Sequence, residues 1–181
     1  MLILKRSARR YSAQSLQSGI TLIEMIITVA LMLIVFTASI AGFFRFNDRQ
    51  TVQNTANEVK QFLSSARTRA RVRDNPDPTV CSALQGYKVE TNGQTLEQKA
   101  VCGLGKFSIS QEIVRDTYDI PTGLTVTDFE VTYFTLQGLA NVVNNDVYIS
   151  RNSNIFYFQV RSSGEVTEGC YVSSVGSTTC L

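Results

Sequence analysis

The chain contains no histidine and no tryptophan among its 181 residues. Without an imidazole there is no histidine general base, no histidine metal ligand and no Ser-His-Asp relay. The sequence also offers no paired carboxylates at a credible spacing and no nucleophile beside a base. A glycine-rich stretch, Gly103-Leu104-Gly105-Lys106, lacks the spacing of a phosphate-binding loop and predicts a turn between strands. We therefore expect no catalytic residues, no metal site, no cofactor and no enzymatic activity.

Acidic residues are absent from residues 1–19, which carry Lys5, Arg6, Arg9 and Arg10. Removing these four from the 17 basic residues of the chain leaves 13 against 15 acidic residues, a net charge of −2. The overall charge of +2 therefore says little about nucleic acid, and the basic leader indicates membrane topology instead. The length and the 44% hydrophobic content favour one globular domain with a tail.

One apolar segment, residues 20–44, is long enough to cross a bilayer. It includes a stretch without charge, Met25 to Phe44, which as a helix covers the ~30 Å hydrocarbon core. The basic leader predicts a cytoplasmic N-terminus and an extracytoplasmic C-terminal domain, although Arg45 and Arg49 weaken this asymmetry. Two alternatives are a secretory signal that is cleaved before Gly42 and a plain signal anchor that is not cleaved.

Glu24 is unusual because it lies at the edge of this apolar helix. A carboxylate there costs a few kcal/mol unless it has a partner, and a single span offers none. Alternatively, Glu24 lies at the depth of the membrane interface, where the N-terminal end of the helix dipole stabilises its charge.

The short basic leader runs into Gly19-Ile20-Thr21-Leu22-Ile23-Glu24 and then into the charge-free stretch. This order resembles the prepilin signal of type IV pilins and type II secretion pseudopilins. The resemblance implies that a prepilin peptidase cuts after Gly19 and methylates the new N-terminal residue, Ile20. It also implies that the Glu24 carboxylate pairs with the N-terminal amine of a neighbouring subunit and sets the axial register during assembly.

The helical pattern continues beyond the membrane segment. Apolar residues recur at spacings of four and three, which is a heptad seam that predicts burial against a sheet. The Asn75-Pro76-Asp77-Pro78 run predicts that the helix ends at Asp74. We expect a leader (1–19), a membrane or filament-core half (20–46), an amphipathic half (47–74) and a β-rich head (75–181). The seam residues are Val52, Ala56, Val59, Leu63, Ala66 and Ala70.

The pattern of residues 79–181 has a period near two and predicts an antiparallel sheet, so the expected fold is α+β. The run Ile155-Phe156-Tyr157-Phe158 is apolar on both faces, which favours a central strand with one face against the helix. The expected strands are Val80 to Glu90, Leu96 to Cys102, Lys106 to Val114, Leu124 to Leu136, Val147 to Ser150, Ile155 to Arg161 and Glu165 to Val172.

The four cysteines lie on the side that the topology places outside the cytoplasm, where disulfides persist. Three connectivities are possible. We favour Cys81 with Cys102 and Cys170 with Cys180, because each pair joins nearby segments. The alternatives are free buried thiols and a metal site, although the chain has no C-x-x-C spacing. A C-terminal clasp of this kind resembles the disulfide-bounded region of many pilins.

Four arginines, Arg67, Arg69, Arg71 and Arg73, raise the question of nucleic-acid binding. At 100° per residue they lie on opposite sides of a helix and form no single basic stripe, which favours solvated flanks. The stretch from Phe62 to Asn75 resembles H-type minor pseudopilins. So do the segments ending in Leu136-Gln137-Gly138 and in Arg161-Ser162-Ser163-Gly164-Glu165-Val166.

These features predict a structural subunit of a pilus-like or pseudopilus filament, most simply a minor one, for secretion, DNA uptake or pilus biogenesis. Its expected partners are other subunits, the prepilin peptidase, an inner-membrane assembly platform and, before assembly, membrane lipid. The alternatives are a major pilin, a DNA-binding tip subunit and a membrane-anchored domain that never polymerises.

Overall fold

The computed structural model describes residues 20–103, 109–135 and 139–181. The leader with Gly19, the predicted turn at residues 104–106, the start of the strand expected from Lys106 and the Gln137-Gly138 pair lie outside these residues. The chain divides after Gly42 into two compact units, of which the second is Phe43–Leu181. This second unit contains the head and the part of the long helix that packs on it.

The long helix α1 comprises Leu22–Val72 and ends two residues before the predicted Asp74. Arg73 has a φ of 54°, in the left-handed region. The amide of Asp74 donates to the carbonyl of Arg69 (3.0 Å), and the amide of Arg73 donates to the carbonyl of Ala70 (3.3 Å). These two bonds form a Schellman cap, which ends the helix before Pro76 can.

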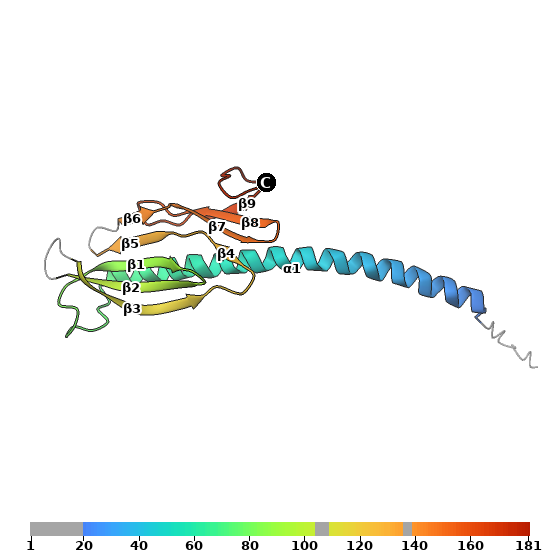
Figure 1. The fold of residues 1–181 in the computed structure, drawn as a ribbon, viewed down its shortest axis with the longest axis horizontal. Coiled ribbons are helices and arrows are strands. Elements are labelled where there is room, and N and C mark those ends of the chain that lie inside the picture. Colours follow the sequence, from blue (N-terminus) through green and yellow to red (C-terminus); the bar gives the residue numbers. More distant parts are fainter. Residues whose placement is uncertain (1–19, 104–108, 136–138) are drawn as a thin grey trace, which may run out of the picture. The chain divides into compact units, whose positions relative to one another are not determined.

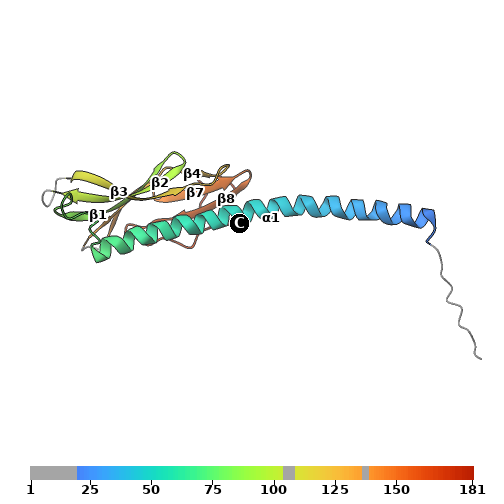
Figure 2. The ribbon, with the colours of Figure 1, turned by 90° about the horizontal axis from the view of Figure 1, so that it is seen from below.

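The predicted heptad seam is the buried face of α1. All six of its residues, Val52, Ala56, Val59, Leu63, Ala66 and Ala70, are at most 1% exposed. They pack into one core with residues of both sheets, including Tyr87, Tyr133 and Phe158. Figures 1 and 2 show the part of α1 after Gly42 running along one face of the strands. The predicted α+β architecture, a long helix on an antiparallel β-structure, is confirmed.

The first sheet has five antiparallel strands in the order β3-β2-β1-β5-β6. Gly93, with a φ of 63°, lies in the predicted Asn92-Gly93 turn between the first two strands of the chain. The strands are β1 (Leu84–Asn92), β2 (Thr95–Gly103), β3 (Ile109–Asp119), β5 (Glu130–Phe134) and β6 (Ala140–Val143).

The second sheet has four antiparallel strands in the order β4-β7-β8-β9. β8 lies between β7 and β9, and its Phe156 and Phe158 are buried in the core shared with α1. The central position predicted for the Ile155–Phe158 run is therefore confirmed. The strands are β4 (Thr125–Val126), β7 (Asp146–Arg151), β8 (Asn154–Gln159) and β9 (Cys170–Val172).

Several of the predicted strands were wrong in extent. β1 begins at Leu84, four residues after the predicted Val80, and β3 continues to Asp119, five residues beyond the predicted Val114. The stretch from Leu124 to Leu136 forms not one strand but two, which belong to different sheets. The amide of Thr127 donates to the carbonyl of Tyr148 in β7 (3.0 Å), whereas the carbonyl of Phe129 accepts from the amide of Thr91 in β1 (3.1 Å), so the chain changes sheets between them.

The expected strand from Glu165 to Val172 is mostly irregular. It pairs only through a bridge between Val160 and Val166 and through β9. Gly169, with a φ of 83°, separates these two regions because a left-handed residue interrupts an extended strand. Strand β6 was not predicted.

The face of the first sheet that points away from α1 carries a network of ion pairs. Lys88 pairs with Glu90 (2.8 Å) and Glu112 (2.6 Å), and Lys99 pairs with Glu90 and with Glu97 (2.8 Å). Burial raises the pKa of Glu90, but hydrogen bonds from Lys88 and Lys99 outweigh it and hold that pKa below its usual value.

This network predicts that the head loses stability in acid. A carboxylate with a depressed pKa in the folded state stabilises the fold above its unfolded pKa of about 4.3, and this contribution is lost as the pH falls through the folded pKa. We therefore expect the free energy of unfolding, measured by urea denaturation, to fall between pH 5 and pH 3. Glu90→Gln should flatten this decrease. Parallel profiles for the two proteins would show that Glu90 contributes nothing.

Candidate functional site

The first part of α1 presents an exposed apolar surface. Within the described residues, α1 is the one helix long and apolar enough to cross a membrane. The exposed fraction is 79% for Leu22 and 69% for Phe36, and it is 74% for Ile20, just before the helix. An exposed apolar surface of this extent needs a covering layer, either lipid or other apolar helices.

Two threonines in the first part of α1 have partners for their hydroxyl groups within the helix. Thr28 Oγ1 donates to the carbonyl of Met25 (2.9 Å), and Thr37 Oγ1 donates to the carbonyl of Ile34 (2.9 Å). Because each hydroxyl is bonded within the helix, neither needs water. Both threonines are therefore compatible with a lipid or helix-packed environment.

Glu24 lies in the first turn of α1, one turn from Ile20. The Thr21 hydroxyl accepts a hydrogen bond from the backbone amide of Glu24 (3.3 Å). This places Thr21 at the N-cap and Glu24 at the third helical position, which are the two positions of a capping box. Glu24 forms no ion pair with any of the described residues.

The second part of α1 is fixed to the head by polar contacts that the sequence did not reveal. Asp48 accepts from Arg151 Nε (3.2 Å) and Asn152 Nδ2 (2.8 Å). Lys60 donates to the carbonyl of Glu168, and its ammonium lies near the rings of Phe156 and Phe158. Each contact joins residues about a hundred positions apart, so no local sequence pattern predicts it.

The four arginines after Ala66 do not form a common basic surface. Arg67 Nη2 donates to the carbonyl of Ser163 (3.2 Å), and Arg69 pairs with Asp116 (3.7 Å). Arg71 and Arg73 are exposed. Two of the four cations therefore make contacts within the head, which weakens the case for nucleic-acid binding through this segment.

Both favoured disulfides are present. Cys81 pairs with Cys102, and Cys170 pairs with Cys180. The first links the segment after α1 to the end of β2, and the second ties the C-terminal residues to β9. No described cysteine is free.

Removing the first disulfide should destabilise the head strongly. In the chain-entropy model, a link across 21 residues contributes about 3 kcal/mol. We expect the double variant Cys81→Ala/Cys102→Ala to lower the free energy of unfolding by about this amount in urea denaturation. The double change avoids a new free thiol. A loss below ~1 kcal/mol would show that this link does not restrain the unfolded chain.

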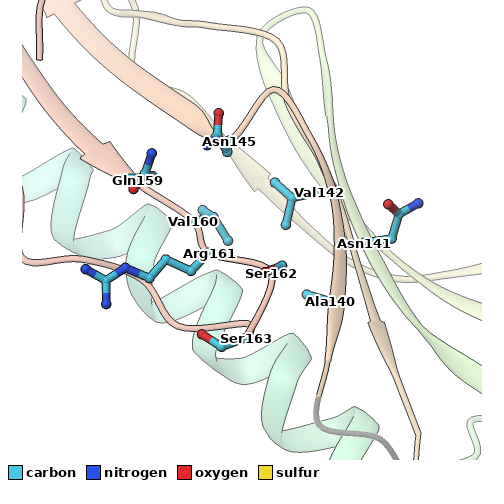
Figure 3. Close-up of a pocket in the computed structure, with 9 residues that line it drawn as sticks. All are labelled: Ala140, Asn141, Val142, Asn145, Gln159, Val160, Arg161, Ser162 and Ser163. Atoms are coloured by element: carbon cyan, nitrogen blue, oxygen red, sulfur yellow. The ribbon is translucent and has the colours of Figure 1, made fainter.

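A cavity of about 580 Å³ lies between β6 and the segment that follows β8 (Figure 3). Two backbone hydrogen bonds connect its walls. The amide of Ala140 donates to the carbonyl of Ser162 (2.8 Å), and the amide of Val160 donates to the carbonyl of Asn145 (2.9 Å). Its lining holds amides, hydroxyl groups and one guanidinium but no carboxylate. The cavity lies where an edge of the first sheet meets the second sheet. The described residues contain no group of three metal-ligating side chains there or elsewhere.

Comparison with known proteins gives one family match. The family model for the prokaryotic N-terminal methylation motif matches residues 14–40, which include Gly19, Ile20 and Glu24. No curated protein and no solved structure matches the chain. The match supports a type IV pilin-like structural subunit, which is the class that the resemblance of this segment predicts. It also supports membrane anchoring through the first part of α1, as is typical of pilins.

Proposed function

We propose that the protein is a minor subunit of a type IV pilus-like or pseudopilus filament that serves secretion, DNA uptake or pilus biogenesis. The observation that carries this proposal is the methylation motif at residues 14–40, placed at the start of a helix whose first part is apolar and exposed. In this role the protein is a substrate of the prepilin peptidase and a building block, and it is not an enzyme.

Processing creates an amine that can form an ion pair with Glu24. Cleavage after Gly19 frees the amine of Ile20, which the same peptidase methylates and which keeps its positive charge. In a filament, this amine on one subunit pairs with the Glu24 carboxylate of another. The charge pair is directional, whereas apolar contacts are not, so it selects one axial register among many helix packings of similar energy.

The apolar surface of residues 20–44 has two environments in turn. Before assembly it lies in the membrane, and after assembly it packs against the same segments of neighbouring subunits. Both environments are apolar, so moving between them has a small net free energy. Assembly therefore depends on close helix packing and on the Glu24 pair.

The head lies outside the cytoplasm in this proposal. Its two disulfides fit an oxidising compartment. The buried seam of α1 and the head share one core. The position of α1 in the filament core therefore fixes the position of the head on the filament surface. The head is thus the part that meets other components of the machine.

Copy number distinguishes a minor from a major subunit. We expect quantitative mass spectrometry of sheared, purified filaments to find this protein far less abundant than the main subunit of the same filaments. Deleting its gene should reduce the number of filaments without changing the diameter of those that remain. An abundance equal to or above every other subunit would assign it to the shaft as a major pilin.

A further inference from the structure

A groove of about 650 Å³ lies between α1 and the C-terminal part of the second sheet. We call it the α1–β9 groove. It combines aromatic rings with polar side chains at the end of the head that adjoins the charge-free stretch in sequence. Its lining includes Phe46, Arg49, Gln53, Phe156, Tyr171 and Leu181.

Arg49 provides a positioned cation in this groove. Its guanidinium lies 4.2 Å from the centroid of the Tyr171 ring, and the Tyr171 hydroxyl donates to the Arg49 carbonyl (2.7 Å). The neighbouring Asp48 is already bound by Arg151 and Asn152. Among the described residues, Arg49 has no carboxylate partner. The groove therefore holds a fixed positive charge that an external anion can neutralise.

The position of Arg49 along α1 matches the headgroup layer of a bilayer. Arg49 follows Phe44, the last residue of the charge-free stretch, by five positions, or about 7.5 Å of helix. The polar layer on each side of a bilayer is about 5–8 Å thick. Arg45 lies one turn earlier on the same side of the helix, and Phe46 is 65% exposed beside them.

We propose that the α1–β9 groove binds the phosphate of an anionic phospholipid in the leaflet on the head side while the subunit is still in the membrane. Arg49 is the phosphate ligand, and Phe46 contacts the upper acyl chain. This site holds the head on the membrane surface until the subunit is extracted for assembly. The inference rests on the proposed function, because it requires α1 to lie in a bilayer.

The absence of tryptophan makes a direct test possible. Phe46→Trp gives the full chain a single fluorophore at the groove. The protein is reconstituted in phosphatidylcholine vesicles that contain phosphatidylglycerol, with bromine atoms on one lipid or the other. Brominated phosphatidylglycerol should quench Trp emission with a relative binding constant about fivefold above that of brominated phosphatidylcholine, as one phosphate-bound arginine gives. Equal quenching by the two lipids would overturn the proposal.

Charge variants in the Phe46→Trp background assign the effect to Arg49. Arg49→Gln should bring the relative binding constant close to one, and Arg49→Lys should restore most of it. Arg71→Gln removes an exposed arginine from the far end of the same helix and should change nothing. A preference for phosphatidylglycerol that survives Arg49→Gln would place the lipid contact elsewhere and contradict the proposed ligand.

A second fluorophore separates this proposal from the proposed function. Leu33→Trp, in the otherwise unchanged chain, reports on the middle of the charge-free stretch. Strong quenching of this variant by lipids brominated deep in the acyl chain shows that α1 spans the bilayer. With that result, equal quenching at position 46 overturns only the lipid site. No deep quenching at position 33 would instead overturn the membrane-anchored state on which both proposals depend.

Discussion

Incorporation of the protein into filaments is expected to fall at least about tenfold when Glu24 is replaced by Gln. The pairing of a carboxylate with an amine in apolar surroundings differs from a neutral contact by a few kcal/mol, and ~1.4 kcal/mol already gives a factor of ten. The measurement is the ratio of filament-bound to membrane-bound protein, by quantitative immunoblotting of sheared filaments and membranes from the same cells.

Glu24→Gln is a selective change because it keeps the helix start. Glutamine also serves at the third position of a capping box, so the contact of Thr21 with the backbone amide of residue 24 remains available. The variant should be cleaved and should form both disulfides like the original protein. Asp119→Asn, which neutralises an exposed carboxylate on the head, is the matched control. Normal incorporation of Glu24→Gln would assign its carboxylate to the membrane interface and contradict its role in setting the axial register.

The second large effect is expected in the core that joins α1 to the head. Leu63 is fully buried in the centre of the heptad seam. Leu63→Ala removes three carbon atoms from a packed site and leaves a cavity, which costs about 2–5 kcal/mol. We expect urea denaturation of the purified protein to show this loss with little change in the denaturant slope.

Gln61→Ala gives the comparison for Leu63→Ala. Gln61 is exposed on the same helix two residues earlier, so its replacement should change the free energy of unfolding by less than about 0.5 kcal/mol. Equal effects of the two changes would mean that the seam is not packed against the sheets. A large effect of Leu63→Ala alone would support one cooperative unit of helix and head.

The features predicted well from the sequence are those with a local pattern. The seam from Val52 to Ala70 follows a heptad spacing, and each of its positions is buried. The Ile155–Phe158 run is apolar on both faces, and it forms the central part of its sheet. Burial requires a continuous apolar face, so the period of the sequence is enough to locate it.

The features that the sequence did not reveal depend on contacts between distant residues. The break between β4 and β5 occurs because Thr127 pairs with one sheet and Phe129 with the other, and the residues between them carry no strong turn signal. Gly86 lies so close to β5 that a Cβ atom there would be 2.2 Å from the Tyr133 carbonyl oxygen. Nothing in the neighbourhood of Gly86 distinguishes this close approach from an ordinary strand glycine.

The candidate functional residues also fall into those with a local sequence pattern and those that depend on distant contacts. Gly19, Ile20 and Glu24 belong to a short linear motif, so a reading of the sequence finds them and the family match covers them. In the sequence, Arg49 is only a charge that weakens the charge asymmetry on which the predicted membrane topology rests. Its contact with Tyr171 spans 122 positions, and this contact is what makes it part of a groove.

The most direct test of this account is the N-terminal residue and intact mass of the protein isolated from its native membrane. We predict a chain that begins at Ile20, carries one added methyl group on its N-terminal amine and retains two disulfides. A chain that begins at Gly42 would identify a secreted domain released by a signal peptidase. A chain that begins at Met1 would identify a plain membrane anchor, and either of these results would contradict the assembly role of Glu24.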